Sequence, residues 1–252
     1  MAPAPLALLP ALPSELLTYI LAYQDQTYPT TIIICKSRAS FLSSLLNAIP
    51  ASHPFPSRES SIPTGDEDLY SPSETQPRHP LLIPTLHQIA TSRHINLVFI
   101  PTLSHLRAYL VTFPHQAVRL PPENISKTGG RGIPLLVVYG LVELHHDTSE
   151  WSAQGLGNSL AALVEVGSRS SVKIVLIEER EIEEEDVQVD EVEEGDKWRK
   201  LSKVWEQKVP ILNGSVRRAG LDVDDAGWSG RTIEVGRILG RWFKFGRGDW
   251  VI

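Results

Sequence analysis

Short apolar runs rich in β-branched residues alternate along this chain with segments of helical periodicity. The apolar runs lie at 30–35 (TTIIIC), 95–100 (INLVFI), within 133–144 (IPLLVVYGLVEL) and at 171–179 (SVKIVLIEE), and the helical patterns lie at 38–49, 82–94, 103–113 and 152–169. Continuous apolar runs are typical of strands that are covered on both faces. Strands alternating with helices predict an α/β fold in three layers, with a mainly parallel central sheet and right-handed crossovers.

The two ends of the chain depart from this alternation. We expect residues 1–27 to form an N-terminal helical segment, with a helix over 14–24 that has Ser14 as its N-cap and Glu15 in its first turn. Residues 208–218 and 231–245 have the pattern of consecutive strands joined by turns. The sequence therefore predicts one main domain over 28–252, with an antiparallel C-terminal extension on one edge of the sheet.

Two internal segments have little to bury. Residues 51–80 contain six prolines among many Ser, Thr and acidic residues, which predicts a disordered loop within the domain. Residues 178–196 (EEREIEEEDVQVDEVEEGD) predict a solvated acidic loop, because they lack the alternating Asp/Asn pattern and central Gly of a calcium loop.

Composition is that of an ordinary globular protein. The 252 residues are 42% hydrophobic and 21% charged, which is enough to build a sizeable core. The one cysteine, Cys35, cannot form an internal disulfide, so a reducing nuclear or cytosolic compartment is expected. Prolines interrupt the apolar N-terminus, which argues against a signal peptide, and no run of about 20 apolar residues predicts a membrane span.

Charge is distributed unevenly along the chain. The net charge is −6, but residues 178–196 hold 12 of the 30 acidic residues and one arginine, so the rest of the chain carries 23 basic and 18 acidic residues. From Lys197 onward there are 12 Lys and Arg against 6 Asp and Glu. This asymmetry is compatible with a nucleic-acid surface or with an acidic partner.

Lys36 and Ser37 follow an apolar strand and precede a helix, which is the outline of a phosphate-binding P-loop. A P-loop also needs about four residues and two glycines ahead of its lysine, because their backbone N–H groups hold the phosphate. Here Lys36 follows Cys35 directly and residues 1–64 contain no glycine. Tyr139 stands at the end of the strand 133–139, where a Mg²⁺-supporting acid is needed, and Glu143 comes four residues later. We therefore predict no nucleotide hydrolysis and no cofactor, with Lys36 and Ser37 ending the strand and capping the helix.

Two further clusters contain residue types that are found in catalytic or metal sites. GWSGR (227–231) has Arg231 where a nucleophile elbow needs glycine, which favours a tight turn. ELHHDTSEW (143–151) brings together Glu143, His145, His146 and Asp147 without the spacing of a zinc site. The favoured interpretation is a polar loop in which Asp147, Thr148 or Ser149 caps a helix beginning near Trp151.

The basic segment KWRKLSKVWEQK (197–208) has two interpretations. Trp198, Leu201 and Trp205 are spaced like the buried face of a short helix, which leaves a solvated cationic face. Alternatively, that face contacts nucleic-acid phosphates, and the candidate DNA-binding residues are then Lys197, Arg199, Lys200, Lys203, Arg217 and Arg218. Arg237, Arg241 and Arg247 add to this basic side, and of the neighbours Trp242 and Phe243 one is expected in the core while the other could stack on bases.

The order of these elements resembles the ATPase core of the RecA-like recombinases, over roughly residues 28–245. The stretch LLVVYGLVELHHDTSEWSAQGLGNSLAALVEVG, followed by VKIVLIEE, is similar in layout to the family's Walker B strand, helix and next strand, and WEQKVPILNGSVRR resembles its late strand with a Trp and paired arginines. Because the Walker A glycines are absent and Tyr139 replaces the acid, the chain looks like a degenerate paralog of the Shu-complex type. Lys36, Ser37 and Tyr139 then mark the degenerate nucleotide site.

This resemblance implies a non-catalytic accessory subunit for homologous recombination and DNA repair in the nucleus, working with another RecA-like paralog in a heterodimer or larger complex, with possible DNA contact and no membrane. The family's loop after the VKIVLIEE strand faces DNA, but here that loop begins with acidic residues, which favour a basic partner protein. The alternatives are a RecA-like Elongator accessory subunit serving tRNA modification, a protein-interaction scaffold without nucleic-acid binding, and an enzyme with an unrecognised site. The cytoplasm is the alternative location.

Overall fold

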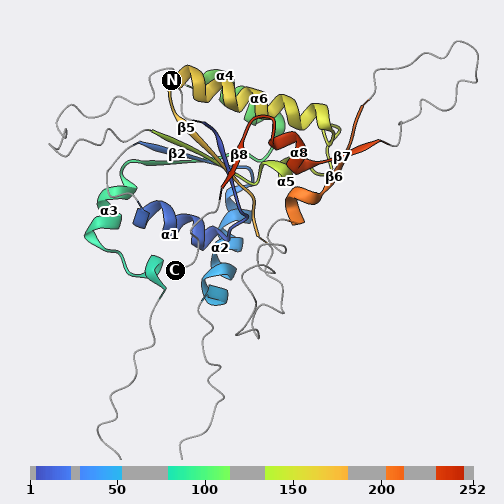
Figure 1. Ribbon diagram of the computed structural model, residues 1–252. Coiled ribbons are helices and arrows are strands. Elements are labelled where there is room, and N and C mark those ends of the chain that lie inside the picture. The colour runs from blue at the N-terminus through green and yellow to red at the C-terminus, as the bar shows by residue number, and fades with distance from the viewer. Residues whose placement is uncertain are drawn as a thin grey trace, which may run out of the picture.

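The computed structural model describes residues 4–23, 29–52, 79–113, 134–180, 203–212 and 231–246, which form a three-layer α/β fold (Figure 1). The strands are β1 (Leu6–Leu8), β2 (Thr30–Ile34), β3 (Ile95–Phe99), β4 (Leu135–Tyr139), β5 (Lys173–Ile177), β6 (Lys208–Pro210), β7 (Thr232–Glu234) and β8 (Lys244–Gly246). The helices are α1 (Pro13–Tyr23), α2 (Arg38–Ser52), the 3₁₀ turn η1 (Pro80–Leu82), α3 (Leu86–Ser92), α4 (Leu103–Thr112), α5 (Leu141–His145), α6 (Ala153–Ser170) and α8 (Val235–Leu239), and residues 203–206 are also helical.

Six strands form one parallel sheet in the order β3-β2-β4-β5-β1-β8. Next to the β3 edge, β2 lies between β3 and β4, with Thr30 opposite both Ile95 and Leu135. This confirms the predicted α/β class and parallel central sheet, and it is consistent with a RecA-like three-layer fold.

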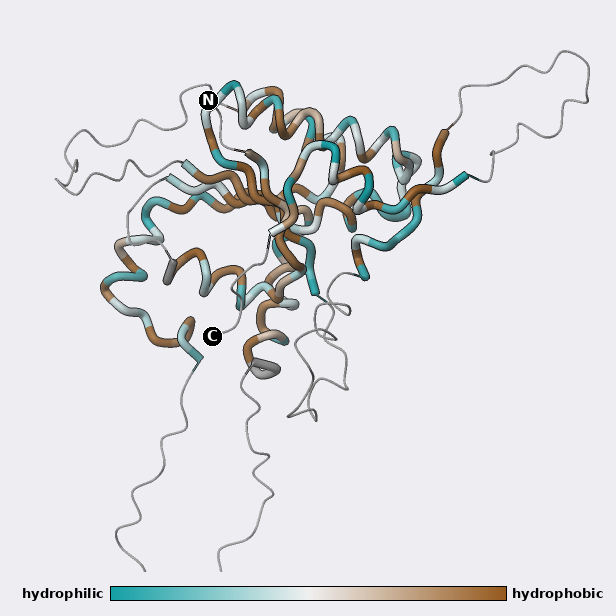
Figure 2. The backbone as a smooth tube through the Cα atoms, viewed as in Figure 1, coloured by the Kyte–Doolittle hydropathy of each residue, from teal (hydrophilic) through white to brown (hydrophobic). Residues whose placement is uncertain are grey.

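Helices cover both faces of the sheet, because successive side chains of a strand point to opposite sides. Ile32 and Ile34 pack with α1 and α2, whereas Ile33 between them packs with the helices of the opposite face. Figure 1 shows α1, α2 and α3 on one side and α4, α6 and α8 on the other, and Figure 2 shows the hydrophobic strands enclosed between these two layers. This double cover explains why the strand sequences are continuously apolar.

The N-terminal segment contains a strand that the sequence pattern did not predict. β1 pairs in parallel with β5 on one side and with β8 on the other, so it lies inside the central sheet. The prediction of a purely helical segment over 1–27 is therefore incomplete. Three residues between prolines are too short to show a strand period, and only the two neighbouring strands give β1 its pairing.

The C-terminal extension contains an antiparallel pair of strands, as predicted, but its predicted place on the edge of the central sheet is wrong. β6 and β7 form a separate two-stranded antiparallel sheet, while β8 joins the edge of the central sheet in parallel. Between them Val235, Ile238 and Leu239 are buried at helical spacing in α8, within a stretch that had been predicted as a strand. The prediction failed there because this helix is a single turn, which is too short for a helical period to be recognised in the sequence.

Helix starts differ from the predictions by a few residues. α1 begins at Pro13, so Ser14 lies inside the first turn instead of at the N-cap, and Glu15 Oε2 accepts a hydrogen bond from Leu12 N at 2.8 Å. α3 begins at Leu86, later than the predicted 82, because Thr85 and Gln88 form a capping box there.

Several predicted features lie outside the described residues. These are positions 53–78 of the predicted disordered loop over 51–80, the acidic segment from 181 to 196 and the GWSG part of the 227–231 motif. Within the described ranges, no helix combines the length and apolar character that crossing a membrane requires.

Candidate functional site

The carboxyl ends of β2 and β4 are the place where an open α/β sheet normally binds a ligand. The chain leaves β2 toward β3 on one side and then returns to β4 on the other, so the direction of the connections reverses between these two strands. Ligands of such sheets bind at this switch point, outside the carboxyl ends of the strands. The residues that end the two strands here are Cys35, Lys36 and Ser37 after β2, and Tyr139 and Gly140 at the end of β4.

Ser37 caps α2, as the sequence predicted. Its Oγ accepts a hydrogen bond from Ser40 N at 3.1 Å, and its backbone carbonyl accepts one from Phe41 N at 3.0 Å. Only Cys35, Lys36 and Ser37 separate β2 from α2. A chain this short cannot form the wide loop of backbone N–H groups that surrounds a phosphate.

Lys36 is held by an acidic residue from the end of β5. Its Nζ forms an ion pair with Glu179 Oε2, and both side chains are about four-fifths buried, at 21% and 18% exposure. The next residue, Arg180, pairs with Glu15 of α1 at 2.6 Å. These two pairs connect the end of β5 to the β2–α2 turn and to α1, and they use the positive charge that a phosphate ligand would need.

Tyr139 fills the switch point from the other side. Its side chain is fully buried, its hydroxyl donates a hydrogen bond to Ala11 O at 2.8 Å, and its ring meets that of Phe41 edge-on at 6.2 Å. Burial, assisted by the nearby charges of Glu179 and Glu178, raises the pKa of Tyr139 well above its ordinary value. The phenol is therefore a neutral packing group, unlike the acid that would support Mg²⁺.

Glu178 is a buried carboxyl group that the sequence analysis did not single out. Its Oε1 accepts a hydrogen bond from Val142 N at 3.0 Å, at the start of α5, where Gly140 turns the chain with a positive φ of 80°. Burial raises the pKa of Glu178 to about 8, against the opposing effect of the backbone N–H groups of Val142, Glu143 and Leu141. In the sequence, the signal for this site is a carboxylate directly after a buried strand. Because Glu178 also begins the acidic segment 178–196, the sequence pattern assigns it to the solvated loop.

Cys35 lies on the same edge and is equally enclosed. Its thiol is 3% exposed, and burial, followed by the charge of Glu178, raises its pKa well above the ordinary value. A neutral, enclosed thiol is a poor nucleophile. Cys35 therefore packs as a small buried hydrophobic residue.

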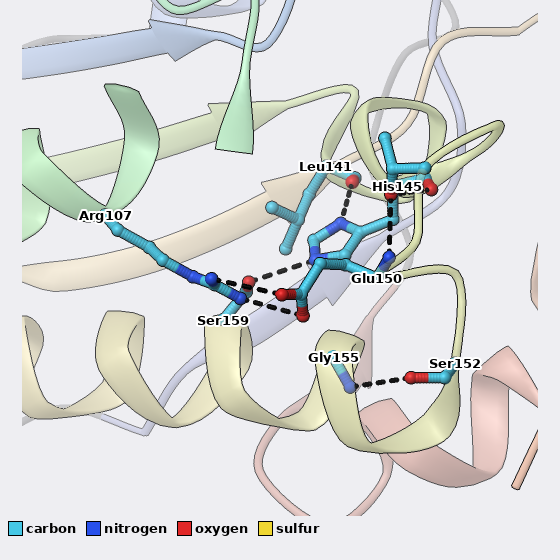
Figure 3. Close-up of polar contacts among 8 residues, drawn as sticks. Arg107, Leu141, His145, Glu150, Ser152, Gly155 and Ser159 are labelled. Carbon is cyan, nitrogen blue, oxygen red and sulfur yellow. Dashed lines mark hydrogen bonds and ion pairs between the residues drawn. The ribbon is translucent and has the colours of Figure 1, made fainter. Parts of the chain in front are cut away.

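His145 and Ser159 form a second arrangement with the outline of a catalytic pair (Figure 3). His145 Nδ1 lies 2.8 Å from Leu141 O and its Nε2 lies 3.0 Å from Ser159 Oγ. The carbonyl can only accept, so Nδ1 carries the proton and the Ser159 hydroxyl donates to Nε2. His145 is fully buried and Ser159 is 2% exposed, and burial lowers the pKa of His145. The pair thus joins α5 to α6 as a structural contact.

The HHDTSEW stretch is organised differently from its prediction. The helix begins at Ala153, and Ser152 caps it by accepting a hydrogen bond from Gly155 N at 3.0 Å, so Asp147, Thr148 and Ser149 are not its N-cap (Figure 3). Ser152 was missed because three other capping residues precede it. Among the described residues no group of three or more His, Cys, Asp and Glu side chains is placed to hold a metal ion.

Most of the predicted basic candidates lie outside the described residues, namely Lys197, Arg199, Lys200, Arg217 and Arg218. Lys203 is exposed, and Trp205, two residues later, is buried at 7% exposure, as expected for the inner face of a short helix. Of the aromatic neighbours, Phe243 is in the core and Trp242 is 42% exposed. One of the two neighbouring aromatic side chains is therefore in the core, as expected.

Comparison with known proteins finds no matching family model and no matching curated protein.

Proposed function

We propose that this chain is a non-catalytic RecA-like accessory subunit that assists homologous recombination and DNA repair by pairing with another RecA-like paralog. One observation carries the non-catalytic part of the proposal. The switch point between β2 and β4 is filled by the chain's own side chains, with Tyr139 fully buried there and Lys36 paired to Glu179. A ligand could enter only by displacing them.

Three contacts support this assignment over a latent ATP site. The Tyr139 hydroxyl is hydrogen-bonded to Ala11, the Lys36 ammonium is neutralised, and the Ser37 hydroxyl, which would have to reach Mg²⁺, accepts the capping hydrogen bond of α2. Freeing the buried tyrosine would leave a large cavity, a change that costs about 3–5 kcal/mol for buried aromatic side chains. The chain therefore acts through its surfaces.

The assignment to recombination rests on the resemblance of residues 28–245 to the RecA-like paralogs. The three-layer fold with its parallel central sheet supports this assignment, because it is the fold that the resemblance implies. A partner paralog is part of the proposal, since a subunit without its own chemistry contributes to repair by what it binds.

Three measurements test the proposal. We expect purified full-length chain to show no ATP turnover and no ATP-dependent shift in its unfolding temperature. A tagged chain, isolated from its native cells and identified by mass spectrometry, is expected to carry a RecA-like paralog of the recombination machinery. Turnover that is abolished by Lys36→Ala would contradict the non-catalytic assignment.

The pull-down also separates the alternatives. Recovery with two RecA-like Elongator subunits and an affinity for tRNA would replace the recombination assignment by tRNA modification. Recovery of partners unrelated to nucleic acid, with no binding of DNA or RNA at low salt, would leave a protein-interaction scaffold.

A further inference from the structure

The turn from α8 into β8 carries several exposed basic and aromatic side chains within nine residues of the chain. Arg237, Arg241 and Lys244 are exposed, and so are Trp242 and Phe245, at 42% and 51%. We call these five residues the α8–β8 surface. It lies at the edge of the central sheet where β8 pairs with β1 (Figure 1).

The backbone between α8 and β8 places three of these residues near one another, namely Arg237, Arg241 and Phe245. Gly240 continues the helical conformation of α8, with φ −58° and ψ −12°, so Arg237 and Arg241, four residues apart, lie on one side of the turn. A Cβ placed on Gly240 would lie 3.8 Å from Phe245 Cε2, so the Phe245 ring lies against the backbone between the two arginines. Phe243 is buried, which anchors the turn.

Among the described residues, the positive charge of this surface exceeds the negative charge in the neighbouring segments. No ion pair joins Arg237, Arg241 or Lys244 to a carboxylate within the described residues. Over 203–212 and 231–246 there are six Lys and Arg residues against two Glu residues, a net charge of +4. A ligand with several negative charges is the complement of such a surface.

The exposed aromatic side chains indicate which class of negatively charged ligand fits this surface. Surfaces that bind single-stranded nucleic acid combine cations that follow the phosphates with exposed rings on which unpaired bases stack. In a duplex the base faces are already stacked and cannot reach such rings. An acidic peptide would use the charges but would leave the flat faces of Trp242 and Phe245 without a matching group.

We propose that the α8–β8 surface binds single-stranded DNA through Arg237 and Arg241 on the phosphates and Trp242 and Phe245 on the bases. This inference rests on the proposed role in recombination for its choice of DNA over RNA. It also differs from the sequence prediction, which placed the DNA contacts between Lys197 and Arg218. The two regions adjoin, because the Trp205 and Phe245 rings lie 6.0 Å apart.

The experiment is a titration of a fluorescein-labelled oligodeoxythymidine strand with the full-length chain, followed by anisotropy from about 50 to about 200 mM salt. Arg237→Gln combined with Arg241→Gln should reduce the slope of log K against log salt by about 1.4, since each phosphate contact on a single strand contributes about 0.7. Trp242→Leu should weaken binding about tenfold with the slope unchanged, whereas Trp242→Phe should retain most of the affinity. Arg38→Gln combined with Arg93→Gln is the charge-matched control, because both arginines are exposed on the other half of the sheet.

Circular dichroism and the unfolding temperature verify that each variant is folded. The proposal is overturned if the wild-type chain does not bind the strand at about 50 mM salt, or if the control pair lowers the slope as much as the test pair. Tighter binding of an oligouridine or of a DNA duplex also overturns it. A tagged chain with both Arg237→Gln and Arg241→Gln should still recover the same partner proteins. Loss of DNA binding with the partners retained is therefore distinguishable from failure of the proposed function. Loss of the partner with intact DNA binding would assign this surface to a protein instead.

Discussion

At the scale of single residues, the most informative group is Glu178, because its charge state depends entirely on its position. The carboxyl group is 2% exposed, and three backbone N–H groups at the start of α5 point at it. These hydrogen bonds favour the charged form but do not offset the loss of solvation, so its pKa rises to about 8. The folded protein therefore holds a proton there at neutral pH that the unfolded chain releases.

This predicts a stability that decreases with increasing pH. Because the folded-state pKa of Glu178 is raised above its ordinary value of 4.5, its contribution is fully present below about pH 4.5 and is lost as the pH rises through about 8. Glu178→Gln should remove this dependence, since the amide oxygen can still accept the Val142 hydrogen bond. The measurement is urea unfolding between these pH values, with Glu165→Gln, an exposed position, as the control. An unchanged pH slope in Glu178→Gln would show that another group carries the effect.

At the scale of elements, α6 contains two glycines, Gly155 and Gly157, of which one has a packing role and the other has none. A Cβ on Gly155 would lie 2.3 Å from Glu150 O, in the loop that Arg107 fixes through ion pairing at 2.9 Å. A Cβ on Gly157 would meet nothing within 4 Å. Gly155 permits the close approach of the loop to the first turn of the helix, while Gly157 has no packing role.

Alanine substitutions at Gly155 and Gly157 should therefore change the free energy of unfolding in opposite directions. Gly155→Ala is expected to destabilise the fold by about 1–3 kcal/mol, because backbone must move away from the new methyl group. Gly157→Ala is expected to stabilise it by about 0.5–1 kcal/mol, because a helix interior favours alanine over glycine. Chemical denaturation of the two variants beside the wild type measures both values. Equal effects would mean that the loop before α6 relaxes freely.

At the scale of the whole molecule, the N-terminal residues are part of the central sheet. β1 separates β5 from β8, and the carbonyl of Ala11 accepts hydrogen bonds from Tyr139 and from Arg180 N. The first and last strands of the sheet in sequence thus lie side by side (Figure 1). The sheet cannot be completed from residues 28–252 alone.

Deletion of residues 1–12 should consequently abolish cooperative unfolding or lower the unfolding temperature strongly, since β5 and β8 lose their common neighbour. Removal of residues after Gly246 is the matched control, because it deletes none of the described elements. Differential scanning calorimetry distinguishes the two. A stable, cooperative chain lacking residues 1–12 would show that the central sheet does not need β1.

The sequence by itself determined the α/β class, the parallel sheet and the absence of a P-loop. These follow from local properties, namely the continuous apolar runs at 30–35 and 171–179 and the lack of glycine before Lys36. Only the tertiary structure decided that β1 enters the sheet, that Glu178 is buried and that Trp242, not Phe243, faces solvent. Each of these depends on contacts between residues far apart in the chain, such as Tyr139 with Ala11, and no local pattern encodes which distant segment will cover a given side chain.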